Sequence, residues 1–356
     1  MARTVLLVSG DRLLTGAALR SLGCSRQPAW VFTPRPIPGP ALRSRWCAGV
    51  MPPTDGADLP AAIASAARAV AATHVVADTV QMCAELTAAA AELAPTLTFP
   101  TNSAARMTAY DHKAMFAEVA VDIGLPMVPT RLVCDAAAAA EHGFDYPVVV
   151  KPAEGSGSFG FRKLGGNAEL ERVLRNWPRR PQVIQPYIDG SDVHVSFLAD
   201  HGDIVAWEIR EPYPPAAPTP GAFRWFHDGA VLEIAQQLAT STAYHGIANV
   251  DLRRDTRTGR YHVLELNPRV FITIDLLAQH GFNLLELGLD LADGRRPDAP
   301  VVAPAGLVYS VGAVKALLRS RPGDLLGAVT WRTVKGALAD LPFTLSRRSA
   351  RAAQHS

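Results

Sequence analysis

The strongest constraint on the fold is the alternation of polar and apolar side chains in the segment His-Val-Leu-Glu-Leu-Asn-Pro-Arg, which ends at Arg269. Successive side chains of a β-strand point to opposite faces of its sheet. Glu265, Asn267 and Arg269 are therefore expected on one face, with Leu264 and Leu266 directed into a core. A strand of this kind requires a sheet that is packed on one side and presents polar groups on the other.

A second acid is expected to face this strand. The runs Ile247–Arg253 and Tyr261–Asn267 are typical of two strands joined by a turn, and symmetric pairing about Thr258 places Asp251 opposite Glu265. Facing carboxylates repel each other unless a cation lies between them, and hard cations prefer oxygen ligands. A surface hairpin with a solvated polar face would show the same alternation, so this segment alone leaves both interpretations open.

A lysine and a loop of small residues follow a buried strand in the middle of the chain. The run Tyr-Pro-Val-Val-Val-Lys, which ends at Lys151, is typical of a β-strand, and a Gly/Ser-rich loop follows Pro152. Glycines let backbone N–H groups approach phosphate oxygens, and Ser156 and Ser158 would add hydroxyl donors. The loop by itself is compatible with an ordinary turn, but an ammonium group at the end of an apolar strand favours a bound anion.

Another lysine lies at the start of a predicted helix. Asp111 is expected to cap this helix, which an apolar stripe continues as far as Gly124. Lys113 would then lie in the first turn, where its charge opposes the helix dipole unless an anion is bound there. A solvated surface lysine is the alternative interpretation.

The segment Gln185–Asp192 is expected to be a strand that runs into a turn. Its backbone could offer donors and acceptors to the edge of an adenine, and Asp192 could bind ribose hydroxyls. A strand and turn without any ligand would have the same sequence character, so the segment indicates a nucleotide only in combination with the other motifs.

Strands and helices alternate over residues 1–103, which predicts a doubly wound α/β domain. The strand Thr4–Gly10 is followed by a helix from about Leu13 to Leu22. The GxGxxG and GxxxxGK[ST] patterns of nucleotide-binding loops are missing there. Residues 26–60 are rich in proline, glycine and arginine and are expected to form an irregular connection.

The composition excludes several classes of protein. The 35 basic and 33 acidic residues leave a net charge of +2, which gives no electrostatic basis for binding nucleic acid. The four cysteines lie far apart, as expected of reduced thiols in a cytoplasmic protein. No stretch reaches the roughly 18 uninterrupted apolar residues that a membrane helix needs, so no membrane partner is expected.

In their order along the chain these motifs resemble the ATP-grasp superfamily, and within it the carbamoyl-phosphate-synthase-like carboxylate–amine ligases. They are Asp-His-Lys at 111–113, Lys-Pro at 151–152, GxGSxG at 155–160, QxYIxG at 185–190 and ExNxR at 265–269. The resemblance implies an N-terminal α/β pre-ATP-grasp domain followed by a two-lobed ATP-grasp fold over residues 104–300. The lobes would span about 104–186 and 187–300, and residues 301–356 would form a mostly helical segment with a frayed basic tail.

The resemblance also implies a role for each motif. Lys113 and Lys151 would contact the phosphates of ATP, and Arg269 would be the catalytic group on the transferring phosphate. The loop that covers the phosphates would contribute Gly155, Ser156, Gly157, Ser158 and Gly160. Adenine and ribose would be bound by Gln185, Tyr187, Ile188 and Asp192. Mg²⁺, or Mn²⁺ in its place, would be held by Asp251, Glu265 and Asn267.

The activity that this resemblance implies is the ligation of a small-molecule carboxylate to an amine through an acyl phosphate, with release of ADP and phosphate. A thiol or another acceptor, or a nucleotide-binding regulatory protein without catalysis, are the alternatives. The segment Val270–Asp275 departs from the aromatic-Gly-Ser stretch of many relatives, so their substrates cannot be transferred. Arg210, Arg224 and Asp275 are candidates for binding substrate, and a homodimer is compatible with the sequence.

Overall fold

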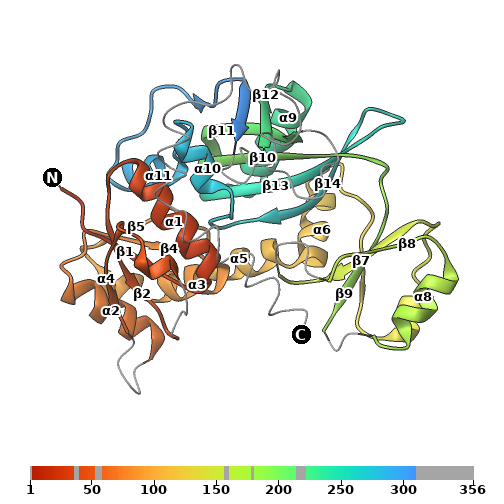
Figure 1. Cartoon of the computed structure of the whole chain (residues 1–356), viewed down its shortest axis with the longest axis horizontal. Coiled ribbons are helices and arrows are strands. Elements are labelled where there is room, and N and C mark those ends of the chain that lie inside the picture. The colour runs from red at the N-terminus through yellow and green to blue at the C-terminus, as the bar shows by residue number, and fades with distance from the viewer. Residues whose placement is uncertain are drawn as a thin grey trace.

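The structure, a computed structural model, describes residues 2–35, 40–52, 58–155, 160–177, 180–213 and 222–309. Figure 1 shows an N-terminal unit at one end of the molecule, a large sheet in the centre and a small sheet at the opposite end. The sheets follow one another along the chain, because strands up to residue 98 form the first, residues 131–186 the small one and residues 190–309 the large one.

The N-terminal unit is doubly wound, as the alternation of strands and helices predicts. Its elements are β1 (Val5–Val8), α1 (Arg12–Cys24), β2 (Ala29–Phe32), the 3-10 helix η1 (Pro40–Arg43), β3 (Cys47–Met51), α2 (Leu59–Ala69), β4 (His74–Ala77), α3 (Val80–Ala88), α4 (Ala90–Leu93) and β5 (Leu97–Thr98). The strands pair in parallel in the order β3-β2-β1-β4-β5. Val5 and Leu7 of β1 pack with α1 on one face, whereas Leu6 and Val8 pack with α2 and α3 on the other.

The expectation of an irregular connection over residues 26–60 is wrong. This stretch contributes β2 and β3, which extend the sheet on one side of β1. Val31 and Phe32 of β2 are fully buried. Strands this short carry little local pattern, and β2 gains its stability from parallel pairing with β1, a partner that is distant in the sequence.

Asp78 is a buried acid directly after β4. Its carboxylate accepts hydrogen bonds from the backbone N–H of Gly10 at 2.8 Å and from Thr15 Oγ1 at 2.8 Å. Burial outweighs these bonds and raises the pKa of Asp78 to about 7. The folded protein therefore keeps a proton on this carboxyl over a pH range in which the unfolded chain has lost it.

We expect Asp78→Asn to stabilise the protein at neutral and alkaline pH. The ordinary pKa of the group is 3.8, so from about pH 4 to about pH 7 the folded state binds more protons and wild-type stability falls as the pH rises. The variant lacks this titration. Its free energy of unfolding, measured with urea, should therefore increase relative to that of wild type by about 2 kcal/mol as the pH rises from about 5 to about 8. The exposed substitution Asp122→Asn serves as the control. A wild-type-to-variant difference that is independent of pH would contradict the expectation.

The large sheet is mainly antiparallel and has strand order β14-β13-β10-β11-β12-β16, with β15 paired to β11. Its strands are β10 (Gly190–Asp200), β11 (Asp203–Tyr213), β12 (Ala222–Phe226), β13 (Gly246–Asp255), β14 (Tyr261–Asn267), β15 (Val301–Val302) and β16 (Gly306–Tyr309), and α9 (Gly229–Thr242) connects β12 to β13. Val195 and Phe197 of β10 are buried in a core with α9. Because side chains alternate along the strand, His194 and Ser196 lie on the opposite face, which carries the candidate site.

The expected helical segment after residue 300 is wrong for residues 301–309. These residues form β15 and β16, which pair with β11 and β12. Residues 310–356 lie outside the part of the chain that the structure describes. In the described part, no helix is long and apolar enough to cross a membrane.

The small sheet has strand order β6-β9-β7-β8 and a core of its own. Its elements are β6 (Arg131–Val133), α7 (Ala136–Ala140), β7 (Val148–Pro152), β8 (Arg162–Leu164), α8 (Asn167–Leu174) and β9 (Gln182–Pro186). Val148, Val150 and Ile184 of the sheet pack against Leu170 of α8. This β-branched packing confirms the strand that was predicted to deliver Lys151 at its end.

Two consecutive helices, α5 (Ala104–Asp111) and α6 (Lys113–Asp122), connect the N-terminal unit to the small sheet. The prediction that Asp111 caps the second helix is wrong, because Asp111 is the last residue of the first. His112 is the cap, and its Nδ1 accepts a hydrogen bond from the backbone N–H of Met115 at 3.3 Å. Lys113 nevertheless lies in the first turn of α6, as expected.

The N-terminal unit and the large sheet share one apolar core. Leu19 and Leu22 of α1 belong to the same buried cluster as Leu277 of α10 (Ile274–Gln279) and Leu285 of α11 (Leu284–Ala292). Figure 1 shows α1 beside these two helices, next to the large sheet. The segment that follows Arg269 is thus packed against the N-terminal unit.

Candidate active site

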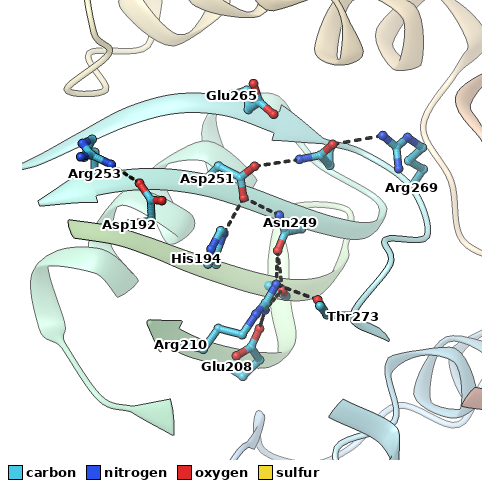
Figure 2. A network of polar contacts seen from close by, with 12 residues as sticks. Asp192, His194, Glu208, Arg210, Asn249, Asp251, Arg253, Glu265, Arg269 and Thr273 are labelled. Atoms are coloured by element: carbon cyan, nitrogen blue, oxygen red, sulfur yellow. Dashed lines mark hydrogen bonds and ion pairs between the residues drawn. The ribbon is translucent and has the colours of Figure 1, made fainter. Parts of the chain in front are cut away.

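The predicted pairing of the two acids is confirmed. In the register of β13 with β14, Asp251 lies opposite Glu265 and Asn249 lies opposite Asn267. These four side chains provide carboxylate and amide oxygens on two neighbouring strands. Figure 2 shows Asn249 in contact with Asp251 across the face of the large sheet, and Glu265 beside them without a contact to either.

A one-residue bulge interrupts the pairing at Leu264. The expectation that Leu264 points into the core is wrong, since this residue is only partly buried, whereas Val263 and Leu266 are fully or almost fully buried. Val263 also pairs along the other edge of β14: its N–H donates to Pro126 O at 2.9 Å, and its carbonyl accepts from Val128 N–H at 3.0 Å. These two edges impose different registers, and the bulge accommodates both.

Asp251 is held by three side chains. One oxygen lies 2.7 Å from His194 Nδ1 and accepts from Asn249 Nδ2 at 2.8 Å, while the other accepts from Asn267 Nδ2 at 3.3 Å. Burial alone would raise the pKa of Asp251, but the charge and hydrogen bond of His194, the Asn249 amide and nearby Arg210 lower it to about 2. The group is therefore a fixed anion at neutral pH.

Two lysines from other parts of the chain approach Glu265. Lys151, at the end of β7 in the small sheet, places its Nζ 2.8 Å from Glu265 Oε2, and Lys113 of α6 places its Nζ 3.9 Å from the same oxygen. Burial lowers the pKa of Lys113, an effect that Glu265 opposes and Lys151 reinforces. Two ammonium groups on one carboxylate leave local positive charge, which suits a phosphate group.

The small-residue loop begins beside these lysines. Lys113 Nζ donates to the carbonyl of Gly155 at 3.0 Å. Gly155 and Gly160 have φ values of 104° and 76°, which L-residues with a side chain rarely adopt. Ser156, Gly157 and Ser158 lie outside the described residues, so the loop is defined only at its two ends.

Arg269 is the buried cation at the end of β14, with 8% of its surface exposed. Its guanidinium donates to Asn267 Oδ1 at 3.1 Å and to Val270 O at 2.9 Å, and its Nε lies 3.6 Å from Asp111 Oδ1. Burial raises the pKa of Asp111, and the positive charges of Arg269 and Lys113 oppose that rise. Asp111 therefore joins the site at its edge, although it caps no helix.

The expected adenine segment lies at the junction of the small and large sheets. Gln185 of β9 is buried and donates to Thr130 Oγ1 at 2.8 Å. The backbone N–H of Tyr187 donates to Pro147 O at 2.9 Å, and Lys163 Nζ lies 3.5 Å from the centre of the Tyr187 ring. The segment is thus held by groups on both sides of it.

Arg253 of β13 organises the turn beyond this segment. It forms an ion pair with Asp192, donates to the carbonyl of Ile188 at 2.5 Å and donates to Tyr187 Oη at 2.9 Å. Figure 2 shows the contact with Asp192, at the end of the polar face away from Arg269. Three of the four residues that the sequence assigns to adenine and ribose therefore contact one guanidinium.

Comparisons with known proteins agree with this geometry. Residues 179–315, which include the large sheet, match a family described as "ATP-grasp in the biosynthetic pathway with Ter operon". The arginine-specific large chain of carbamoyl phosphate synthase from Geobacillus stearothermophilus is 27% identical over 221 residues, which are 55% of this chain and 21% of that protein. The chain spans about a fifth or less of the length of the curated relatives that it matches.

Solved structures share the fold over most of the chain. N5-carboxyaminoimidazole synthetase from Staphylococcus aureus, complexed with ADP, has a TM-score of 0.67 at 12% identity, over 90% of this chain and 86% of that one. The chain has the ATP-grasp fold. The L-amino acid ligase of Bacillus licheniformis has the same fold, with a TM-score of 0.60 at 19% identity over 82% of this chain and 74% of its own.

The ATP-grasp site has a donor set that fits a hard cation. Asp251, Glu265 and Asn267 offer oxygens on one face of the β13–β14 hairpin, and Mg²⁺ prefers oxygen ligands. Lys151 and Lys113, which contact Glu265 in this structure, could exchange part of that contact for the phosphates of a nucleotide. These groups have the charges that a nucleotide and its metal require.

The three candidate substrate residues have protein partners. The Arg210 guanidinium is buried and contacts Glu208, Asn249 and two hydroxyl groups. Arg224 is exposed and donates from Nε to Glu211 Oε1 at 2.7 Å. Asp275 accepts from Arg20 Nε at 2.6 Å, which links the segment after Arg269 to α1. Their roles in binding substrate stay predictions.

Sequence reasoning missed His194, Asn249 and Arg253. Asn249 and Arg253 could have been found by continuing the strand alternation, because they lie two residues on either side of Asp251. In the register of β10 with β13, His194 lies directly opposite Asp251, and Asp192 lies opposite Arg253. What the sequence did not contain was the order of the strands, and without it no partner for β13 other than β14 was visible.

Proposed function

We propose that the chain is an ATP-dependent carboxylate–amine ligase that forms an amide or peptide bond through an acyl phosphate and releases ADP and phosphate. The observation that carries the proposal is the convergence of Lys113 and Lys151 on Glu265, opposite Asp251. Cations for phosphate and oxygens for a metal meet there at one point of an ATP-grasp fold. The carbamoyl phosphate synthase relative and the L-amino acid ligase fold support a ligase.

In the proposed first half-reaction, a carboxylate oxygen of the acid attacks the γ-phosphorus of ATP. The bond between that phosphorus and the β–γ bridging oxygen breaks, and ADP leaves with the electron pair. Lys113 and Lys151 neutralise phosphate oxygens, and Arg269 stabilises the charge on the transferred group. Asp251, Glu265 and Asn267 would hold Mg²⁺, which when bound supplies Lewis-acid stabilisation of the phosphates.

In the second half-reaction, the amine attacks the acyl carbon, phosphate leaves, and the amine proton passes to solvent. An acyl phosphate is far more electrophilic than a carboxylate, which is why the first step is needed. The segment Val270–Asp275, adjacent to Arg269 and packed against the N-terminal unit, is placed to shape the acceptor site.

The test is the formation of ADP and hydroxamate from MgATP and hydroxylamine with pooled amino acids and organic acids. Hydroxylamine replaces the unknown amine, so only the acid has to be found. ADP linked to hydroxamate in one pool supports the proposal, and Glu265→Gln should abolish both products. Formation of AMP would overturn the acyl-phosphate mechanism. Thioester formation with a thiol acceptor, or bound ATP without ADP release in any pool, would favour the alternative acceptor or the inactive protein.

We expect Lys151→Met to weaken ATP binding by about 10- to 100-fold, since it removes a charge-assisted contact worth about 1.5–3 kcal/mol. Isothermal titration of the protein with a nonhydrolysable ATP analogue measures the change. Arg162→Met, an exposed charge removal on the neighbouring strand β8, is the matched control and should bind like wild type. Equal affinities of Lys151→Met and wild type would remove Lys151 from the phosphate site.

A further inference from the structure

A second group of candidate metal ligands lies at the β10–β11 turn and the start of β13. Asp200 ends β10, His201 lies in the turn to β11, and His245 directly precedes β13. Asp200 Oδ1 lies 3.4 Å from His245 Nδ1 and 3.9 Å from His201 Nε2, and the three ligand atoms lie within 4.8 Å of one another. The two imidazole rings stack with their centres 4.0 Å apart and 11° between their planes.

These distances are close to those of a tetrahedral metal site. Bonds of about 2.0–2.1 Å at tetrahedral angles place neighbouring ligand atoms about 3.3 Å apart. The Asp200–His245 distance already has this value within 0.1 Å, so it is the His201 imidazole that has to move. That side chain is 75% exposed and has the freedom to do so.

Two features of the surroundings of Asp200, His201 and His245 favour the binding of a cation. Within the part of the chain that the structure describes, His245 Nδ1 is buried and has no hydrogen-bond partner. Arg296 contacts the other oxygen of Asp200 at 3.2 Å and Asp203 at 2.9 Å. Arg296 thereby holds the Asp200 carboxylate with Oδ1 towards the histidines, although its own positive charge would repel a bound cation.

The turn alone does not account for a histidine at position 201. Asp200 pairs with Asp203, and the two residues between them, His201 and Gly202, have φ values of 48° and 103°. Two-residue turns with positive φ favour Asn-Gly above other pairs. Asparagine would serve the turn at least as well, so the imidazole is the feature that needs another explanation.

We propose that Asp200, His201 and His245 form a binding site for a divalent transition metal such as Zn²⁺, with water as the fourth ligand. Two imidazoles and a carboxylate suit this class of metal, whereas Mg²⁺ prefers the all-oxygen set of the β13–β14 hairpin. The backbone N–H of His245 donates to Asn102 Oδ1 at 3.1 Å. A bound metal would therefore tie the β10–β11 turn to the connection that leaves the N-terminal unit.

The test uses the full chain without a histidine tag, stripped of metal with a chelator. Titration with Co²⁺ should give visible d–d absorption for one tetrahedral site, without a thiolate charge-transfer band, and Zn²⁺ should displace the Co²⁺. His201→Asn keeps the preferred turn residue, and His245→Phe keeps a ring in the stack. Each should weaken Co²⁺ and Zn²⁺ binding by at least about 10-fold.

His262→Ala, which removes a histidine of β14 outside the group, is the matched control and should bind like wild type. Zn²⁺ should also raise the melting temperature of wild type more than that of either histidine variant. Glu265→Gln should retain the site, so its loss of ligase activity and the presence of the metal are measured separately. Affinities unchanged in both histidine variants, a thiolate band, or no Co²⁺ binding would overturn the proposal.

Discussion

Replacing Arg269 with alanine is expected to reduce ADP release from MgATP and the acid substrate by about 100- to 1000-fold while leaving nucleotide affinity within about threefold. The guanidinium lies beside the proposed metal ligand Asn267 and close to Asp111, and 92% of its surface is covered by protein. A buried, permanently charged group at this place stabilises charge that develops only during phosphoryl transfer. Single-turnover kinetics with an ATP-binding assay on the same samples separate the two effects.

The matched control for Arg269 is Arg254→Ala, since Arg254 is an exposed arginine on the neighbouring strand β13. It should have wild-type rates. Arg269→Lys keeps the charge but cannot contact Asn267 and the Val270 carbonyl in the same fork geometry, so its rate should lie between those of alanine and wild type. Wild-type turnover in Arg269→Ala would remove this residue from catalysis.

Replacing Arg210 with methionine is expected to destabilise the protein by about 3–5 kcal/mol, because it leaves Glu208 buried without its ionic partner. Arg210 and Glu208 are 2% and 1% exposed. Arg210 also donates to Ser196 Oγ at 2.7 Å and to Asn249 Oδ1 at 2.8 Å. Urea unfolding followed by tryptophan fluorescence measures the loss.

Two further variants show whether the unpaired charge is the cause. Adding Glu208→Gln to Arg210→Met removes that charge and keeps an acceptor for Trp225 Nε1, which donates to Glu208 at 2.8 Å. The double variant should recover part of the lost stability. Arg224→Met breaks the exposed pair with Glu211 on the same sheet and should cost less than about 1 kcal/mol. Similar losses in Arg210→Met and Arg224→Met would contradict the argument from burial.

Arg210 also connects the β13–β14 hairpin to Val270–Asp275, the segment whose sequence departs from that of relatives. Its guanidinium donates to Thr273 Oγ1 at 3.2 Å and to Asn249 Oδ1. Asn249 in turn donates from Nδ2 to Asp251. Figure 2 shows this path from Thr273 to Asp251 in the middle of the sheet. Arg210 therefore helps to hold Asn249, which donates to Asp251.

The parts of the fold that could be predicted are those with local pattern. The two adjacent strands were expected to form a hairpin with Asp251 opposite Glu265, and this pairing is observed, although next to the turn Arg254 pairs with Tyr261 and the assumed register is reached only beyond the bulge. The bulge at Leu264 could not be predicted, since it results from pairing of β14 with residues 126–128, far away in the sequence. The same holds for β2, which pairs with the distant strand β1, and for β3, which pairs with β2.

Individual residues of the site could be predicted from the sequence, but their arrangement could not. Lys113, Lys151 and Glu265 were each selected on local grounds, but their meeting depends on how α6 and the small sheet lie against the large sheet. The break between α5 and α6 shows the limit of a capping argument. Asp111 has the chemistry of a cap, yet it ends one helix and a histidine begins the next.

The separate core of the small sheet has a mechanical consequence. The N-terminal unit and the large sheet share one core, so we expect them to move together. The small sheet has its own core, and a buried cluster of only three residues, Ala114, Ala153 and Val183, packs it against α6. This is a boundary at which the molecule can bend without exposing a large core. Lys151 and Glu265 lie on opposite sides of it, so a rotation at this boundary would separate the lysine proposed to bind phosphate from the hairpin proposed to bind the metal.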